Sequence, residues 1–271
     1  MLTRTTPPGQ SQRAGSTDPA LVVSGLSKSF GANRILDGIN LSVDAGSVVA
    51  LIGANGTGKS TLLRCLVRLI EPTAGTVRAL GLEVTTLDRA GLAAYRSRVG
   101  FVFQRHNLVP RLSALTNVVH GVQSRARGPR TWLQSLARRE VREEAMACLD
   151  SVGLADVARQ RADSLSGGQS QRVAIARMLM QRPELILADE PDASLDPRAG
   201  EEVMGLLNRL AKSQKLALVL ISHHMEHAIQ FSDRIVGLAG GRATLDVPSS
   251  TADPVALHHF FHDRSRRNER P

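Results

Sequence analysis

A glycine-rich stretch that ends in lysine and serine is the strongest chemical pattern in the sequence. The apolar run Val48–Ile52 is followed by Gly53, Ala54, Asn55, Gly56, Thr57, Gly58, Lys59, Ser60 and Thr61. Between a strand and a helix, such a loop turns backbone N–H groups toward phosphate oxygens, and the helix adds its positive end. Lys59 would then reach the β- and γ-phosphates of a nucleoside triphosphate, and Ser60 would bind Mg²⁺. In this context a chance glycine-rich turn is a poor alternative.

Two carboxylates follow a second apolar run. Asp189 and Glu190 come directly after Leu185–Ala188. Asp189 would hold Mg²⁺, through a water molecule, and Glu190 would accept a proton from the attacking water. By itself the pair is equally well explained as two solvated acids at a strand end, and it is the phosphate loop that favours the catalytic interpretation.

Two more polar residues follow apolar runs. His223 comes after Leu216–Ile221, and Gln104 comes after Val99–Phe103. Ligands of open α/β folds bind at the carboxyl ends of the strands, where an imidazole could donate to the γ-phosphate and an amide could bind magnesium or water. Considered alone, a surface histidine, with His224 beside it, and an ordinary loop amide are the commoner explanations.

The pentapeptide that begins at Leu165 continues with Ser166, Gly167, Gly168 and Gln169. Physically it predicts a capped, exposed helix start, which is another place where an anion can bind. Taken alone, an ordinary N-cap would be the favoured explanation.

A framework of alternating strands and helices is needed to position these residues. The four apolar runs named above predict the strands of a mainly parallel α/β sheet, and Leu21–Val23 with Ile39–Val43 predict antiparallel strands that lead into it. Between about Arg111 and Gln181 no strand is predicted, whereas Arg139–Val152 and Gln169–Met180 have apolar residues at helical spacing.

The organisation of the chain follows from these patterns. We expect a disordered leader over residues 1–18, one domain over 19–247 with a helical insertion at about 106–182, and a tail over 248–271. Within the tail, Val255–Phe261 is a candidate for a short docking helix.

Composition excludes some classes of protein. The chain has 271 residues, 42% of them hydrophobic, and no apolar run approaching the roughly 20 residues of a membrane span. The first residues lack the apolar stretch of a secretory signal, so we expect a chain that stays in the cytosol. Two cysteines, Cys65 and Cys148, lack metal-ligand spacing, so reduced thiols are expected. The net charge of +9 fits nucleic acid or an anionic membrane, but the few aromatic residues do not alternate with basic ones, and we expect no nucleic-acid partner.

Taken together, the motifs resemble those of ABC ATPases, in the order that defines that family: the phosphate loop, Gln104, the Leu165–Gln169 pentapeptide, the acidic pair, Ser194–Asp196 and His223. The resemblance covers about residues 20–245. It implies an α/β fold of the P-loop NTPase (RecA-like) type, with an antiparallel β subdomain and an inserted helical subdomain.

The same resemblance implies the partners and the roles of individual residues. ATP would lie between two ATPase subunits in a head-to-tail homodimer, with the pentapeptide of one subunit against the γ-phosphate held by the other. Phe30 matches the aromatic residue that stacks on adenine, and Gln104 the hinge that relays the nucleotide state to transmembrane permease subunits. The chain would lie peripherally on the cytoplasmic face of the cell membrane and act indirectly with an extracytoplasmic solute-binding protein. Ser170 and His224 depart from the commoner residues of the family, but neither replaces a residue with an assigned role.

Within the family, the chain is similar to the ATPases of phosphonate importers. The similarity is carried by Asn117–Gly121, Thr131–Leu136, Gln160–Asp163, Leu187–Asp196 and Asp233–Leu238. It departs at Asp192, where a small apolar residue is usual, and in the basic stretch Arg125–Arg130. For the arginines of the insertion, a solvated basic face is the default interpretation and contact with anionic lipid headgroups is the alternative. These arginines are Arg125, Arg127, Arg130, Arg138, Arg139 and Arg142.

Other functions stay open from the sequence. The cargo could be phosphite, phosphate or another solute, and an accessory ATPase of a phosphonate-degrading complex or an efflux pump would share these motifs. A soluble ABC ATPase acting on nucleic acid or the ribosome usually carries tandem modules or a long coiled coil, and this chain has neither.

Overall fold

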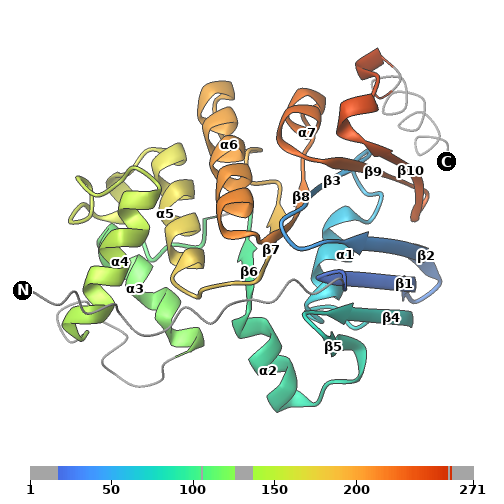
Figure 1. The fold of residues 1–271 in the computed structure, drawn as a ribbon, viewed down its shortest axis with the longest axis horizontal. Helices are drawn as coiled ribbons and strands as arrows, with labels where there is room; N and C mark the ends of the chain where they lie inside the picture. Colours follow the sequence, from blue (N-terminus) through green and yellow to red (C-terminus); the bar gives the residue numbers. More distant parts are fainter. Residues whose placement is uncertain (1–17, 105, 126–136, 256, 258–271) are drawn as a thin grey trace, which may run out of the picture.

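A six-stranded sheet carries the framework of the molecule (Figure 1). The computed structural model describes residues 18–104, 106–125, 137–255 and 257. The strand order is β10-β9-β3-β8-β7-β6, parallel apart from the antiparallel edge strand β10. The strands are β3 (Val48–Ile52), β6 (Val99–Val102), β7 (Leu185–Asp189), β8 (Ala217–Ile221), β9 (Arg234–Ala239) and β10 (Arg242–Pro248).

Both faces of this sheet are buried, which explains why its strands are continuous apolar runs. On one face, Val48, Ala50 and Ile52 pack into a core shared with the helices α3 to α7. On the other face, Val49 and Leu51 pack against α1 and the second sheet. The helices are α1 (Lys59–Leu66), α2 (Arg89–Ser97), α3 (Ala114–Val119), α4 (Arg139–Ser151), α5 (Gly167–Leu179), α6 (Pro197–Gln214) and α7 (Met225–Phe231).

The second sheet is antiparallel, with the order β2-β1-β4-β5. Its strands are β1 (Leu21–Phe30), β2 (Asn33–Val43), β4 (Ala74–Ala79) and β5 (Leu82–Glu83). At the opposite end of the molecule lie α3, α4 and α5 (Figure 1). The expected fold class, with an antiparallel β part and a helical part attached to an α/β core, is therefore confirmed.

Strand boundaries differ from the expectation at two points. Leu216 does not belong to β8, because its backbone N–H donates to the carbonyl of Ala211 at 2.8 Å and so completes the end of α6. Phe103 lies beyond β6, because the last residue of β6 that pairs with β7 is Val102, opposite Ala188. The described residues 106–125 and 137–166 form no strand, only an isolated bridge between Ser113 and Arg161, as expected.

Other expectations fall partly outside the description. Residues 1–17 of the leader, and residues 256 and 258–261 of the candidate docking helix, lie outside the described residues. Cys65 and Cys148 are free thiols, and burial raises the pKa of each to about 11. None of the described helices is long and apolar enough to cross a membrane.

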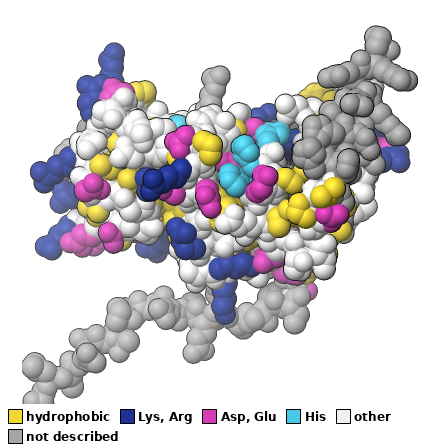
Figure 2. Space-filling model, turned by 90° about the horizontal axis from the view of Figure 1, so that it is seen from above, with side chains coloured by type: hydrophobic (Ala, Val, Ile, Leu, Met, Phe, Trp, Pro, Cys, Tyr) yellow, Lys and Arg dark blue, Asp and Glu magenta, His cyan; other side chains and the backbone are white. Residues whose placement is uncertain are grey.

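Arg125 is the one residue of the basic stretch Arg125–Arg130 that the structure describes, and it pairs with an acid. Arg125 and Arg182 both pair with Glu144, at 2.5 and 2.8 Å. At this helical end, Figure 2 shows acidic side chains among the lysine and arginine side chains. The visible arrangement is a mixed charged surface, and residues 126–136 lie outside the description.

Candidate functional site

The phosphate loop connects β3 to α1 in a conformation that only glycine tolerates at key positions. Gly53 has φ +140°, and a Cβ there would lie 2.3 Å from the carbonyl oxygen of Leu238 in β9. Gly58, the residue that caps α1, has φ +97°, and its Cβ would lie 2.9 Å from the carbonyl of Ile35. The loop therefore packs backbone against backbone, which leaves its outer side open to a ligand.

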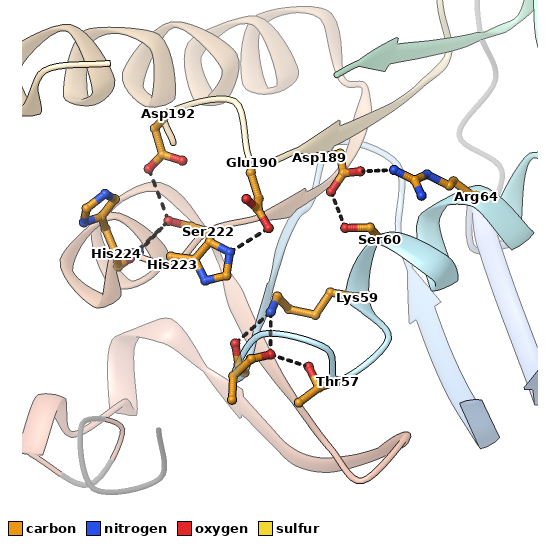
Figure 3. A network of polar contacts seen from close by, with 12 residues as sticks. Thr57, Lys59, Ser60, Arg64, Asp189, Glu190, Asp192, Ser222, His223 and His224 are labelled. Atoms are coloured by element: carbon orange, nitrogen blue, oxygen red, sulfur yellow. Dashed lines mark hydrogen bonds and ion pairs between the residues drawn. The ribbon is translucent and has the colours of Figure 1, made fainter. Parts of the chain in front are cut away.

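Lys59 is folded back onto this loop. Its Nζ donates to the carbonyl oxygens of Gly53 at 2.7 Å and Ala54 at 2.9 Å, and only 4% of the residue is exposed (Figure 3). Burial lowers the pKa of Lys59, while the nearby charges of Glu190 and Asp189 act against this shift. The ammonium group is thus held beside the loop by two neutral acceptors, and a phosphate anion would be a stronger partner.

Asp189 lies at the end of β7, opposite the start of α1. Ser60 Oγ donates to its Oδ1 at 2.8 Å, and Arg64, one turn further along α1, lies 3.6 Å from its Oδ2. Burial raises the pKa of Asp189, an effect that the hydrogen bond from Ser60 and the charge of Arg64 oppose. One hydroxyl and one carboxylate therefore lie within hydrogen-bonding distance of each other at the edge of the sheet.

Glu190 and His223 meet across the ends of β7 and β8. His223 Nε2 lies 2.6 Å from Glu190 Oε1, and both side chains are partly exposed (Figure 3). Glu190 has φ +53°, an uncommon conformation for a non-glycine residue and one that is found at functional sites when the surroundings enforce it. A carboxylate and an imidazole, two groups suited to proton transfer and hydrogen bonding, are thus in direct contact at the edge of the sheet.

A hollow of about 290 Å³ joins these groups to the antiparallel sheet. It is lined by Phe30, Ile35, Asn55, Gly56, Gly58, Lys59, Ser60, Thr61 and Glu190. Phe30 is 51% exposed, and Lys28 Nζ lies 4.7 Å from the centre of its ring. An exposed aromatic ring thus lies at one side of the hollow and the phosphate loop at the other.

Gln104 follows β6 at the same sheet edge and is exposed. Because Val102 pairs with Ala188, the chain leaves β6 next to the point at which β7 reaches Asp189. Gln104 is not among the residues that line the hollow.

The Leu165–Gln169 pentapeptide lies elsewhere. Ser166 caps α5: its Oγ accepts from the backbone N–H of Gln169 at 3.2 Å, and Gln169 Oε1 accepts from the N–H of Ser166 at 2.9 Å. A Cβ on Gly167 would lie 3.3 Å from Leu195, so this helix start packs against the Ser194–Asp196 segment. None of its residues lines the hollow at the phosphate loop, so a single chain does not bring the two motifs together.

Four residues that contact this site were not predicted from the sequence to have a role in it. Arg64 pairs with Asp189, and three others, Asp192, Ser222 and His227, form a buried polar group beside Glu190 and His223. Of these, only Asp192 could be noticed in the sequence, because it is a charged residue where related ATPases usually have a small apolar one. Figure 2 shows histidine side chains gathered beside acidic ones on one face of the molecule.

Comparison with known proteins identifies the group to which this arrangement belongs. Residues 36–193 match the protein family described as "ABC transporter". The chain is 50% identical over 232 residues to the phosphate-import ATP-binding protein PhnC of Mycolicibacterium smegmatis, covering 86% of this chain and 88% of that one. It is 47% identical over 234 residues to the phosphonates import ATP-binding protein PhnC of Frankia casuarinae, covering 86% and 92%.

A solved structure agrees with this result. The ATP-binding cassette MJ0796, in a dimeric post-hydrolysis state bound to ADP and Pi, superposes with a TM-score of 0.74 at 34% identity. The match covers 84% of this chain and 98% of that one.

Proposed function

Because the chain belongs to the ABC transporter family as an ATP-hydrolysing subunit, we propose that the residues at the carboxyl edge of its sheet carry out the hydrolysis. The observation that carries this assignment is the convergence of Lys59, the Ser60–Asp189 contact and the Glu190–His223 contact at the ends of β3, β7 and β8. In this role the phosphate loop binds the β- and γ-phosphates, Lys59 exchanges its carbonyl partners for phosphate oxygens, and Phe30 stacks on adenine.

Glu190 acts as the general base. Its carboxylate accepts the proton of the attacking water, and His223 donates to the γ-phosphate that develops charge. Lys59 and the backbone N–H groups of the loop stabilise the same charge from the other side. Gln104, which follows β6, is placed to contact the attacking water or Mg²⁺.

The residues at the start of α1 fit a magnesium ion. Hard oxygen donors are what Mg²⁺ prefers, and Ser60 Oγ and the buried Asp189 carboxylate lie 2.8 Å apart, with the Arg64 guanidinium 3.6 Å from the other carboxylate oxygen. We propose Ser60 and Asp189, with Gln104, as the residues that hold it. When bound, the ion neutralises the negative charge of the phosphates.

A head-to-tail homodimer completes the site. Within one chain the capped helix start formed by Ser166, Gly167, Gly168 and Gln169 does not line the hollow at the phosphate loop, and it offers backbone N–H groups suited to a phosphate. The second copy would therefore supply these groups to the nucleotide. The dimeric state of the MJ0796 cassette supports this arrangement.

We propose that the chain powers a phosphonate importer from the cytoplasmic face of the membrane, with permease subunits as its direct partners and a solute-binding protein as an indirect one. The names of the relatives support the cargo class. A hollow of about 460 Å³ between the core and the helical end offers a docking place for the permease, because it holds the stacked rings of Phe101 and Phe103, 4.2 Å apart, and the exposed Leu69. It lies beside Gln104, which would relay the nucleotide state.

Two experiments test these assignments. Glu190→Gln is expected to bind ATP with parental affinity and to lose hydrolysis by a factor of about 10²–10⁴. Parental turnover by this variant would show that Glu190 is not the base. The control is Glu226→Gln, which makes the same substitution at an exposed position of α7 and should leave hydrolysis unchanged.

The cargo is tested by growth. A deletion strain, complemented with the parent or with Lys59→Ala, is grown with a phosphonate or with phosphate as the sole phosphorus source. Loss of growth on the phosphonate alone, restored only by the parent, is the expected result. Loss on phosphate alone would instead assign phosphate, the cargo in the name of the Mycolicibacterium smegmatis relative.

A further inference from the structure

A buried carboxylate lies directly behind the Glu190–His223 pair. Asp192 is in the turn that follows β7, two residues beyond Glu190, and only 1% of its side chain is exposed. Its Oδ2 lies 2.7 Å from Nδ1 of His227 in α7, whose side chain is 15% exposed. Because an ionised carboxylate only accepts hydrogen bonds, Nδ1 of His227 is the donor in this contact.

The same carboxylate also reaches the loop that carries His223. Ser222, fully buried and adjacent to His223, has its Oγ 3.3 Å from Asp192 Oδ2 (Figure 3). The hydroxyl in turn accepts from the backbone N–H of His224 at 3.1 Å. A single side chain from the β7 turn therefore contacts both the loop after β8 and the helix that follows it.

Helix α6 packs against Asp192 and His227. A Cβ on Gly200 would lie 3.4 Å from the Cβ of Asp192 and 3.7 Å from Cε1 of His227, which are van der Waals distances and show how closely the helix approaches the pair. The carbonyl of Asp192 accepts from the N–H of Leu195 at 3.2 Å, which ties the pair to the Ser194–Asp196 segment. The ring of Phe231 packs against His227 with its centre 5.9 Å away.

Packing alone does not require charge at this place. Apolar residues of similar volume could fill the space between the turn, α6 and α7, and replacing a buried polar pair by apolar residues is often neutral for stability. What directional hydrogen bonds add is a fixed position. That position matters here because Glu190, with φ +53°, must be held in an unfavourable backbone conformation while its Oε1 stays 2.6 Å from His223.

We propose that Asp192 and His227 form a positioning pair that, through Ser222, fixes the catalytic carboxylate of Glu190 and the imidazole of His223 relative to each other. The inference rests on the roles proposed above for Glu190 and His223. It makes the loops after β7 and β8 one unit, so that the base and the phosphate-contacting histidine keep their geometry when the nucleotide binds. Neither member of the pair contacts the nucleotide hollow.

The test compares variants that remove the polar contacts with one that keeps them. Asp192→Val combined with His227→Phe removes both polar partners at once and leaves no buried charge unpaired. Asp192→Asn keeps an oxygen that can accept from both His227 and Ser222. The exposed Glu226→Gln, one residue before His227, is the matched control for loss of a carboxylate near this place. For each variant, kcat and KM for MgATP and the unfolding temperature are measured.

We expect the apolar double variant to unfold within a few degrees of the parent and to lose about 10- to 100-fold in kcat, with KM changed less than twofold, because displacement of reacting groups by a fraction of an ångström affects the chemical step. Asp192→Asn should keep kcat within about threefold and Glu226→Gln within twofold. In a His223→Ala background, the double variant should cause less than a twofold further loss. Parental kcat in the double variant would overturn the proposal and leave the pair a purely structural one.

The same experiment separates this inference from the roles on which it rests. If Glu190→Gln is inactive while the double variant turns over like the parent, the positioning pair alone is refuted. If Glu190→Gln itself turns over like the parent, the assignment of Glu190 fails, and the inference falls with it.

Discussion

Gly53→Ala should damage the phosphate loop far more than the loss of a flexible glycine would. The added Cβ would lie 2.3 Å from the carbonyl oxygen of Leu238, so the loop or β9 has to move by about 0.7 Å to reach the 3.0 Å below which real Cβ contacts essentially never fall. The φ of +140° adds about 1–3 kcal/mol, since this region is open essentially only to glycine. Such a shift at the start of the loop displaces the backbone N–H groups that face the phosphates.

The matched control is Gly240→Ala. Gly240 lies in the turn after β9, has φ +55°, and a Cβ there would meet nothing within 4 Å, so this variant bears only the backbone cost of about 1–2 kcal/mol. Thermal unfolding and the affinity for a fluorescent ATP analogue are measured for both. We expect Gly53→Ala to lower the affinity at least tenfold and Gly240→Ala to leave it within twofold. Equal affinities in the two variants would refute the view that the backbone contact with Leu238 sets the shape of the loop.

Three further perturbations have defined outcomes. Burial raises the pKa of Glu144, but the bonds from Arg125 and Arg182 outweigh it and hold this pKa below its usual 4.5. The folded state is therefore stabilised above the ordinary pKa and loses this contribution as pH falls through the lowered one. Glu144→Gln should lower the unfolding temperature by a few degrees at pH 7, with the difference closing in acid, and a pH-independent difference in a thermal scan would contradict this. The hydroxyl of the fully buried Tyr95 donates to the carbonyl of Leu66 at 2.9 Å, so Tyr95→Phe should cost about 1–2 kcal/mol in urea unfolding, whereas an unchanged midpoint would be the contrary result. Removing Mg²⁺ with EDTA should abolish hydrolysis while ATP analogue binding is kept in part, and undiminished hydrolysis would contradict the assigned metal ligands.

The sequence was informative where the site depends on strand ends. Lys59, Glu190 and His223 each follow an apolar run, and the parallel sheet brings the ends of those runs to one edge. This follows from topology, because strands of the same direction end on the same side. The fold class could be predicted for a related reason, since strands buried on both faces are continuous apolar runs.

Contacts between side chains distant in the sequence could not be predicted in this way. Asp192 and His227 are 35 residues apart, and no local pattern relates one to the other. They meet because the turn after β7 and helix α7 pack side by side in the folded chain. The strands β4 and β5 also gave little signal, because most of their residues are exposed and only Val77 and Ala79 of β4 alternate with polar neighbours.

The central claim is that the capped start of α5 completes the nucleotide site only across two chains. The most direct test is the mass of Glu190→Gln in solution, measured by light scattering with and without MgATP. We expect twice the chain mass of 29.1 kDa with MgATP, the single-chain mass without it, and loss of the ATP-dependent dimer when Ser166→Arg is added. A Glu190→Gln chain that stays at the single-chain mass while saturated with MgATP would contradict the claim.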